Sequence, residues 1–169
     1  MKKIFISLVS LLVFTSCVLH VYRFTSVNYN NSRISISAGL VNSEDEKSPV
    51  EYIGVSDVRS NVNTPHKVKI LSSTIKIIDS NNKEYIAKTN SNSGYIHIYK
   101  QGVIITDDFK AYIGKVQLDD GRIIDIPPLS FKKTVYVERY SVISDTINAG
   151  GRGKEIFSGT VEDYKKQKK

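Results

Sequence analysis

The side chains that could carry out chemistry are few and widely spaced. The chain of 169 residues has three histidines, at positions 20, 66 and 97, and one cysteine, Cys17, which follows an apolar run. Structural zinc sites need clustered Cys and His ligands, and many hydrolases hold a serine nucleophile in a glycine-flanked turn. Neither pattern occurs, and we predict a protein that is not an enzyme and has no cofactor and no metal.

The paired acids do not change this interpretation. Asp107-Asp108 and Asp119-Asp120 are adjacent pairs, and neighbouring residues on a strand point to opposite faces. An envelope hydrolase or metal-binding enzyme on a β-sandwich scaffold remains the alternative. A concave site that joins His66 or His97 to a carboxylate would favour that alternative.

The beginning of the chain has the layout of an export signal. Lys2 and Lys3 precede an apolar run that ends at Phe14, and small polar residues follow. This pattern predicts a signal peptide over residues 1–16. Its removal would lower the formal charge from +7 to +5. An uncleaved transmembrane helix over residues 4–22 is a second possibility, because a bilayer-spanning helix needs about 20 residues.

The sequence Val13-Phe14-Thr15-Ser16-Cys17 resembles the lipobox of bacterial lipoproteins in its permissive form. The resemblance implies cleavage before Cys17 and attachment of palmitate-like acyl chains to its sulfur, which would make Cys17 the membrane anchor. Two or more acyl chains hold a protein stably on a membrane, whereas one holds it only marginally. A leader that is cleaved without lipid attachment is a third possibility.

The body of the chain reads as strands and turns. Residues 34–38 alternate apolar and polar side chains, as a half-buried strand does. Residues 67–79 also alternate, around Ser72-Ser73, which predicts a bulge or a crossing between sheets. Asp119-Asp120-Gly121 is the strongest hairpin signal. Further strands are expected over residues 50–58, 84–89 and 109–118. We expect about six to nine strands in an all-β sandwich over residues 33–158.

The segment from Gly121 to Lys133 is similar to the terminal strands of small, mostly uncharacterised Gram-negative lipoproteins with an immunoglobulin-like sandwich. The shared features are a glycine-led hairpin, an apolar strand, the pair Pro127-Pro128 and a Phe-Lys-Lys exit. The resemblance implies an immunoglobulin-like antiparallel β-sandwich and brings no catalytic residues.

One strand combines aromatic and polar side chains. Strict alternation from Tyr95 to Tyr99 places Ile96 and Ile98 on one face and Tyr95, His97 and Tyr99 on the other. Tyrosine offers apolar area with a hydrogen-bonding tip, so this stripe could contact a partner. It could equally be an ordinary exposed strand face.

The two flanking segments have different compositions. Residues 17–32 would carry the lipidated cysteine and an apolar, aromatic stretch close to the membrane. Residues 159–169 form a basic tail or a short helix that starts at Ser158 or Thr160. Four lysines of this tail could attract anionic lipid, namely Lys165, Lys166, Lys168 and Lys169.

Together these features predict a membrane-anchored lipoprotein of the cell envelope. It would face the periplasm or the cell surface from the inner or outer membrane. We expect a non-enzymatic binding or structural module whose partners are the membrane and an envelope protein. Nucleic acid is not expected as a partner, because export removes the chain from it despite the positive charge.

Overall fold

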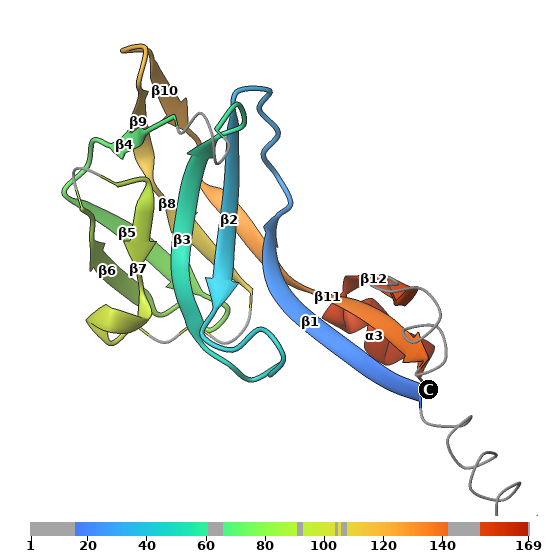
Figure 1. The fold of residues 1–169 in the computed structure, drawn as a ribbon. Helices are drawn as coiled ribbons and strands as arrows, with labels where there is room; N and C mark the ends of the chain where they lie inside the picture. The colour runs from blue at the N-terminus through green and yellow to red at the C-terminus, as the bar shows by residue number, and fades with distance from the viewer. Residues whose placement is uncertain are drawn as a thin grey trace, which may run out of the picture. The chain divides into compact units, whose positions relative to one another are not determined.

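The computed structural model describes residues 16–60, 66–90, 93–103, 105, 108–141 and 153–168 (Figure 1). They fall into two units, a larger one of residues 22–134 and a smaller one drawn from residues 1–21 and 135–169. Most of the predicted signal peptide, residues 1–15, lies outside the described residues. The same is true of Asp107 and Lys169.

The described chain is mostly β-strand, and the strand pairs β1–β2, β2–β3, β3–β7, β4–β9, β5–β6, β5–β8, β8–β11 and β9–β10 are antiparallel. The predicted all-β antiparallel sandwich with a short C-terminal helix is therefore confirmed. The strands are β1 (Ser16–Ser26), β2 (Ile34–Leu40), β3 (Val50–Asp57), β4 (Val68–Ile70), β5 (Thr74–Asp79), β6 (Glu84–Lys88), β7 (Tyr95–His97), β8 (Phe109–Tyr112), β9 (Gly114–Leu118), β10 (Ile123–Ile126), β11 (Leu129–Ser141) and β12 (Lys154–Thr160). A 3-10 helix, η1 (Tyr99–Gln101), follows β7, and α3 (Val161–Gln167) follows β12.

The strands form two sheets. The larger sheet has the order β6-β5-β8-β11-β1-β2-β3-β7, with β12 also paired to β11, and the smaller sheet has the order β10-β9-β4. Within the larger unit the sheet curls, so that β5, β6 and β8 lie behind β2, β3 and β7 in Figure 1.

The core of the larger unit comes from the inward positions of these strands. Ile53 and Val55 of β3 and Ile75 and Ile77 of β5 are at most 1% exposed. Full burial of such a side chain contributes roughly 1.5–3 kcal/mol. At one end of the core three aromatic rings pack together: Phe24 lies edge-on to Phe109, which stacks on Phe131.

The strands outnumber the six to nine expected from the sequence, because two alternating runs divide between the sheets. The run over residues 67–79 becomes β4 in the smaller sheet and β5 in the larger one, so the predicted crossing at Ser72-Ser73 is confirmed. The run over residues 109–118 divides in the same way into β8 and β9. The phase of the alternation changes at each crossing, from Ile70 to Ile75 and from Ile113 to Val116, and this shift of an odd number of residues marks where the chain passes between the sheets.

The turn between β5 and β6 shows how local chemistry fixes a hairpin. Asn82 adopts the left-handed backbone that Asn tolerates, with φ of 61°. Asp79 Oδ1 accepts hydrogen bonds from the backbone N–H groups of Asn81 and Lys83, both at 2.9 Å, and Oδ2 accepts one from Tyr85. These bonds, first among them that from Lys83, lower the pKa of the Asp79 carboxyl.

In the smaller unit, α3 packs on strand residues. Thr160 caps the helix, with its hydroxyl accepting a 3.1 Å hydrogen bond from Asp163 N, so the predicted start at Thr160 is confirmed. The Tyr164 hydroxyl lies 2.8 Å from His20 Nε2, and its ring packs against Phe157. Val161 is buried.

Two strands were not predicted. Residues 18–24, expected to be a membrane-proximal stretch, lie within β1, and residues 154–160, for which no strand was predicted, form β12. Neither segment alternates cleanly in sequence. Of the second possibility, a transmembrane helix over residues 4–22, residues 16–22 are strand, and among the described residues no helix has the length and apolarity to cross a membrane.

Candidate functional site

The predicted aromatic stripe lies on a short edge strand. Tyr95 and His97 project outward from β7, which is last in the order of the larger sheet, while Ile96 and Ile98 are buried. In the register with β3, Tyr52 lies opposite His97. We call the set Tyr52, Tyr95 and His97 the aromatic face.

Two glycines allow the tyrosine rings to lie low on the sheet. A Cβ atom added at Gly39 would lie 2.4 Å from Cε1 of Tyr52, and one added at Gly54 would lie 2.8 Å from Cε1 of Tyr95. The rings occupy the space that side chains at these positions would need. The ring centroids of Tyr52 and Tyr95 are 5.5 Å apart at an interplanar angle of 63°, an edge-to-face contact. The glycines therefore leave the space in which the two rings lie.

Tyr99, the third predicted contact residue, is exposed but belongs to η1, beyond the end of β7. The predicted division into buried isoleucines and exposed aromatic residues is confirmed, while the strand itself ends at His97. Tyr95 and Tyr99 are 46% and 49% exposed, which leaves roughly half of each side chain available for contact.

A second candidate is a cluster of ion pairs at one end of the larger unit. Asp57, at the end of β3, has a fully buried side chain. Its Oδ2 accepts a hydrogen bond from Nη2 of Arg59 at 2.9 Å and lies 3.3 Å from Nε of Arg33. Burying a carboxylate is costly unless it is paired and hydrogen-bonded, and both conditions are met here.

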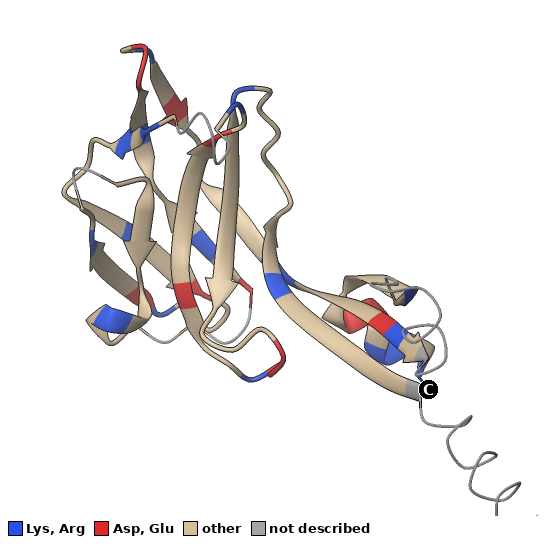
Figure 2. Ribbon diagram, in the orientation of Figure 1, with Lys and Arg blue, Asp and Glu red and all other residues tan. Residues whose placement is uncertain are grey.

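The hairpin between β9 and β10 supplies the other acids of this cluster. Asp120 Oδ2 accepts hydrogen bonds from Nη2 of Arg122 and Nη2 of Arg33, both at 2.7 Å. These contacts, with Arg122 the stronger, hold the pKa of the Asp120 carboxyl far below its usual range. Figure 2 shows charged segments at this end of the unit, on the hairpin and near the end of β3.

His66 joins the cluster through Asp119, whose Oδ2 faces His66 Nδ1 in a short contact. His66 also lines a hollow of about 250 Å³ together with Tyr95 and three serines, Ser56, Ser60 and Ser93. The structure thus brings a histidine and a carboxylate together beside a concave surface, which is the arrangement that would favour an enzyme.

The cluster does not suit a divalent metal ion. One ligand atom each from Asp57, His66 and Asp119 lie within 4.8 Å of one another. However, Nη2 of Arg59 lies 2.9 Å from Asp57 and 3.4 Å from Asp119, so a cation between these carboxylates would stand beside a guanidinium. Like charges at such a distance repel strongly away from bulk water. We interpret the cluster as an ion-pair network that joins β3 to the β9–β10 hairpin.

The serines do not complete a nucleophilic site. Ser60 Oγ accepts a 3.0 Å hydrogen bond from the backbone N–H of His66. A serine nucleophile needs a general base within hydrogen-bond reach. Within the described part of the chain, no serine hydroxyl forms a hydrogen bond with the His66 ring.

The predicted membrane-contact residues all belong to the smaller unit. Cys17 is exposed and lies in β1. Lys165 and Lys166 are in the last turn of α3, where positive charge favours the helix, and Lys166 Nζ pairs with Glu162 at 2.8 Å. The Nζ of Lys168 lies 4.5 Å from the centroid of the Tyr164 ring.

Comparison with protein-family models, with curated proteins and with solved structures finds no match for this chain.

Some residues of both candidate sites were not identified from the sequence. Tyr52 lies on a strand that was correctly located, but its position opposite His97 depends on the order of β3 and β7 in the sheet. Asp57 and Arg33 are single charged residues at strand ends, and their pairing depends on the β2–β3 register, in which Ile34 lies opposite Asp57. The only signal in the sequence for this network was an acidic residue, Asp57, at the end of an apolar strand.

Proposed function

We propose that this protein is an exported, non-enzymatic binding module of the cell envelope, held to a membrane through lipid on Cys17. It recognises an envelope protein through the aromatic face and the neighbouring Tyr99. The export signal, the lipobox-like sequence and the scarcity of catalytic side chains support this proposal. A leader that is cleaved without lipid attachment is the alternative.

The observation that carries the binding role is the construction of the aromatic face. Tyr52 and Tyr95 are held low over Gly39 and Gly54 by close contact. Rigid tyrosine side chains supply contact area at a low entropic cost, and tyrosine is enriched among the residues that dominate binding energy. A half-exposed Tyr95 beside a hollow of about 250 Å³ gives a partner both a surface and a recess.

The position of Cys17 sets how the body would be attached. Cys17 lies inside β1, so lipid on its sulfur would be joined to the folded chain without a flexible linker. Lys165, Lys166 and Lys168 in the same unit would add attraction to anionic headgroups, since each lysine near such a surface contributes on the order of 1 kcal/mol.

Site-specific photocrosslinking tests the binding role. A photoreactive benzoylphenylalanine at position 95 should form a covalent adduct with a discrete envelope protein in intact cells. The same residue at position 86, where Ile86 is 61% exposed on β6, is the matched control. An adduct from position 95 alone supports the proposal, whereas the same adducts from both positions, or none from position 95, contradict it.

The contact between His66 and Asp119 supports a second candidate function, a hydrolase. In that case His66, oriented by Asp119, would act as general base beside the serine-lined hollow. Hydrolysis of an activated acyl ester should then fall at least 100-fold in His66→Gln and remain unchanged in His97→Gln. Equal rates in both variants would remove this candidate.

A further inference from the structure

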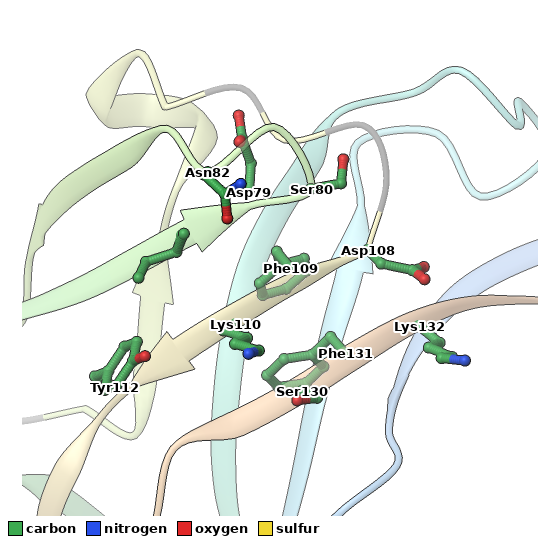
Figure 3. Close-up of a pocket in the computed structure, with 11 residues that line it drawn as sticks. Asp79, Ser80, Asn82, Asp108, Phe109, Lys110, Tyr112, Ser130, Phe131 and Lys132 are labelled. Atoms are coloured by element: carbon green, nitrogen blue, oxygen red, sulfur yellow. The ribbon is translucent and has the colours of Figure 1, made fainter.

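A second hollow, of about 320 Å³, opens over β5, β8 and β11 in the larger unit (Figure 3). Its volume is within the range of small-molecule sites. The hollow is bounded on one side by the turn after β5, which contributes Ser80 and Asn82. Neither the aromatic face nor the ion-pair network contributes a residue to it.

The strand register places its central side chains in one row on the outer face of the sheet. Ile78 of β5 lies opposite Lys110 of β8, and Lys110 lies opposite Ser130 of β11. Lys132 follows two residues later on β11 and therefore projects from the same face. Figure 3 shows Lys110 and Ser130 on neighbouring strands, with Lys132 further along β11.

The lysines of this row differ from their neighbour Lys76 in their pairing. Lys76 Nζ lies 3.4 Å from Glu84 Oε1 and 4.9 Å from the centroid of the Tyr112 ring. Neither Lys110 nor Lys132 forms an ion pair with any residue that the structure describes. Two exposed ammonium groups and a hydroxyl thus line one hollow, and neither ammonium group is held by a carboxylate of the described residues.

Two acids also line the hollow, and both are hydrogen-bonded to backbone. Asp79 accepts bonds from its own turn and from Tyr85, and Asp108 Oδ1 accepts a 3.2 Å bond from Lys133 N. These neutral donors hold both carboxylates in place, and the lining carries two acidic and two basic side chains. Lys110 and Lys132 therefore remain as the groups with free capacity to donate to a ligand.

We propose that this hollow binds a phosphoryl group attached to an apolar chain, either on a lipid headgroup or on a soluble phosphate ester. Lys110 and Lys132 neutralise the phosphoryl charge, and the Ser130 hydroxyl donates a hydrogen bond to one of its oxygens. Ile78 and Tyr112 line the part that takes the apolar chain. This site does not depend on lipid attachment at Cys17.

Titration of the full isotope-labelled chain, followed by NMR, tests the proposal. The probes are dihexanoyl phosphatidic acid below its micelle concentration, inorganic phosphate, and dihexanoyl phosphatidylcholine. Phosphatidic acid should shift the amide signals of Lys110, Ser130 and Lys132, and it should bind more tightly than either other probe. If inorganic phosphate binds as tightly as phosphatidic acid, the apolar part of the proposal is overturned. If phosphatidylcholine binds as tightly as phosphatidic acid, the anionic part is overturned.

A matched pair of double variants separates a site from general charge attraction. Lys110→Gln with Lys132→Gln should weaken phosphatidic acid binding about 20-fold. This is close to the product of the two fold-changes expected when each lysine contributes on the order of 1 kcal/mol. Lys69→Gln with Lys115→Gln removes the same charge from exposed positions on β4 and β9 and should change the affinity less than twofold. Equal weakening in both double variants would overturn the site.

Vesicles distinguish the two ligand sources. If the ligand is a lipid headgroup, sedimentation with phosphatidylglycerol-containing vesicles should fall in the Lys110 and Lys132 variant relative to the Lys69 and Lys115 variant. If the ligand is a soluble ester, both double variants should sediment equally while their affinities for monomeric phosphatidic acid still differ. If the two double variants differ neither in sedimentation with vesicles nor in affinity for monomeric phosphatidic acid, the proposal is overturned.

Discussion

At the scale of single residues, the ion-pair network around Asp57 is the feature of the larger unit that depends most on the exact side chains present. Asp57 is fully buried, and its carboxylate contacts arginines on both sides, Arg33 before β2 and Arg59 after β3. A buried ion pair gives little net stability compared with an apolar pair, but the loss of one partner leaves an uncompensated charge. The carboxylate of Asp57 is therefore difficult to replace.

We predict that Asp57→Asn lowers the free energy of unfolding by about 3 kcal/mol, since breaking a buried pair commonly costs 3–5 kcal/mol and Arg59 is partly exposed. Urea denaturation measures this value. Asp125→Asn, at an exposed acid on β10, is the matched control and should change the value by less than about 0.5 kcal/mol. Similar effects of the two substitutions would show that Asp57 is not structurally important.

Asp120 predicts a dependence of stability on acid pH. Arg122 and Arg33 lower its pKa in the folded state, so on acidification the unfolded chain binds the proton first. The resulting stabilisation is complete above the ordinary carboxyl pKa of about 3.9 and is lost as the pH falls toward the lower folded value. Between about pH 4 and pH 2, urea midpoints should fall less steeply in Asp120→Asn than in the unmodified chain. Parallel curves would contradict the assignment.

At the scale of elements, alternation in the sequence located β2 and β5 well, because their buried positions alternate with more exposed ones. The same rule correctly assigned the exposure of Tyr95 and His97. Alternation could not show that β7 pairs with β3, because register depends on partners distant in sequence. Cys17 and the tail lysines were identified from local patterns, whereas Tyr52, the ion-pair network and the hollow required the folded sheet.

Within the β3–β7 pair, Gly54→Ala should displace the Tyr95 ring, because the added methyl group would lie 2.8 Å from its Cε1 atom. We expect the photocrosslink from the neighbouring Tyr52 position to fall severalfold. The melting temperature should fall only modestly, because overpacking of this kind typically costs about 1–3 kcal/mol. Ser35→Ala, at an exposed position of β2 that lines neither hollow, should leave the crosslink unchanged. Equal crosslink yields in the two variants would show that the ring position does not matter.

In the smaller unit, α3 has seven residues and is too short to be stable alone, so it depends on its cap and on packing. Thr160→Ala should destabilise the helix by about 1 kcal/mol, and Thr160→Ser should restore most of this loss. Hydrogen exchange of the α3 amides is the measurement. Unchanged protection in Thr160→Ala would show that packing of Val161 and Tyr164 is sufficient.

At the scale of the whole molecule, the proposed anchor and the proposed recognition surface belong to different units. Cys17 and the tail lysines lie in the smaller unit, and the aromatic face and both hollows lie in the larger one. The all-β class could be predicted from turn signals and alternation, whereas the division into two units could not, because β1 and β11 each contribute residues to both. The local sequence of a long strand does not show at which residue the strand passes from one unit to the other.

The account depends most on the lipid at Cys17, and metabolic labelling with a fatty acid tests it directly. The unmodified chain should incorporate the label and appear in the membrane fraction with a mass that shows removal of residues 1–16 and addition of acyl chains. Cys17→Ser should lose both the label and the added mass. Label retained in Cys17→Ser, or an unlabelled chain in the cytosol with residues 1–16 intact, would contradict the account.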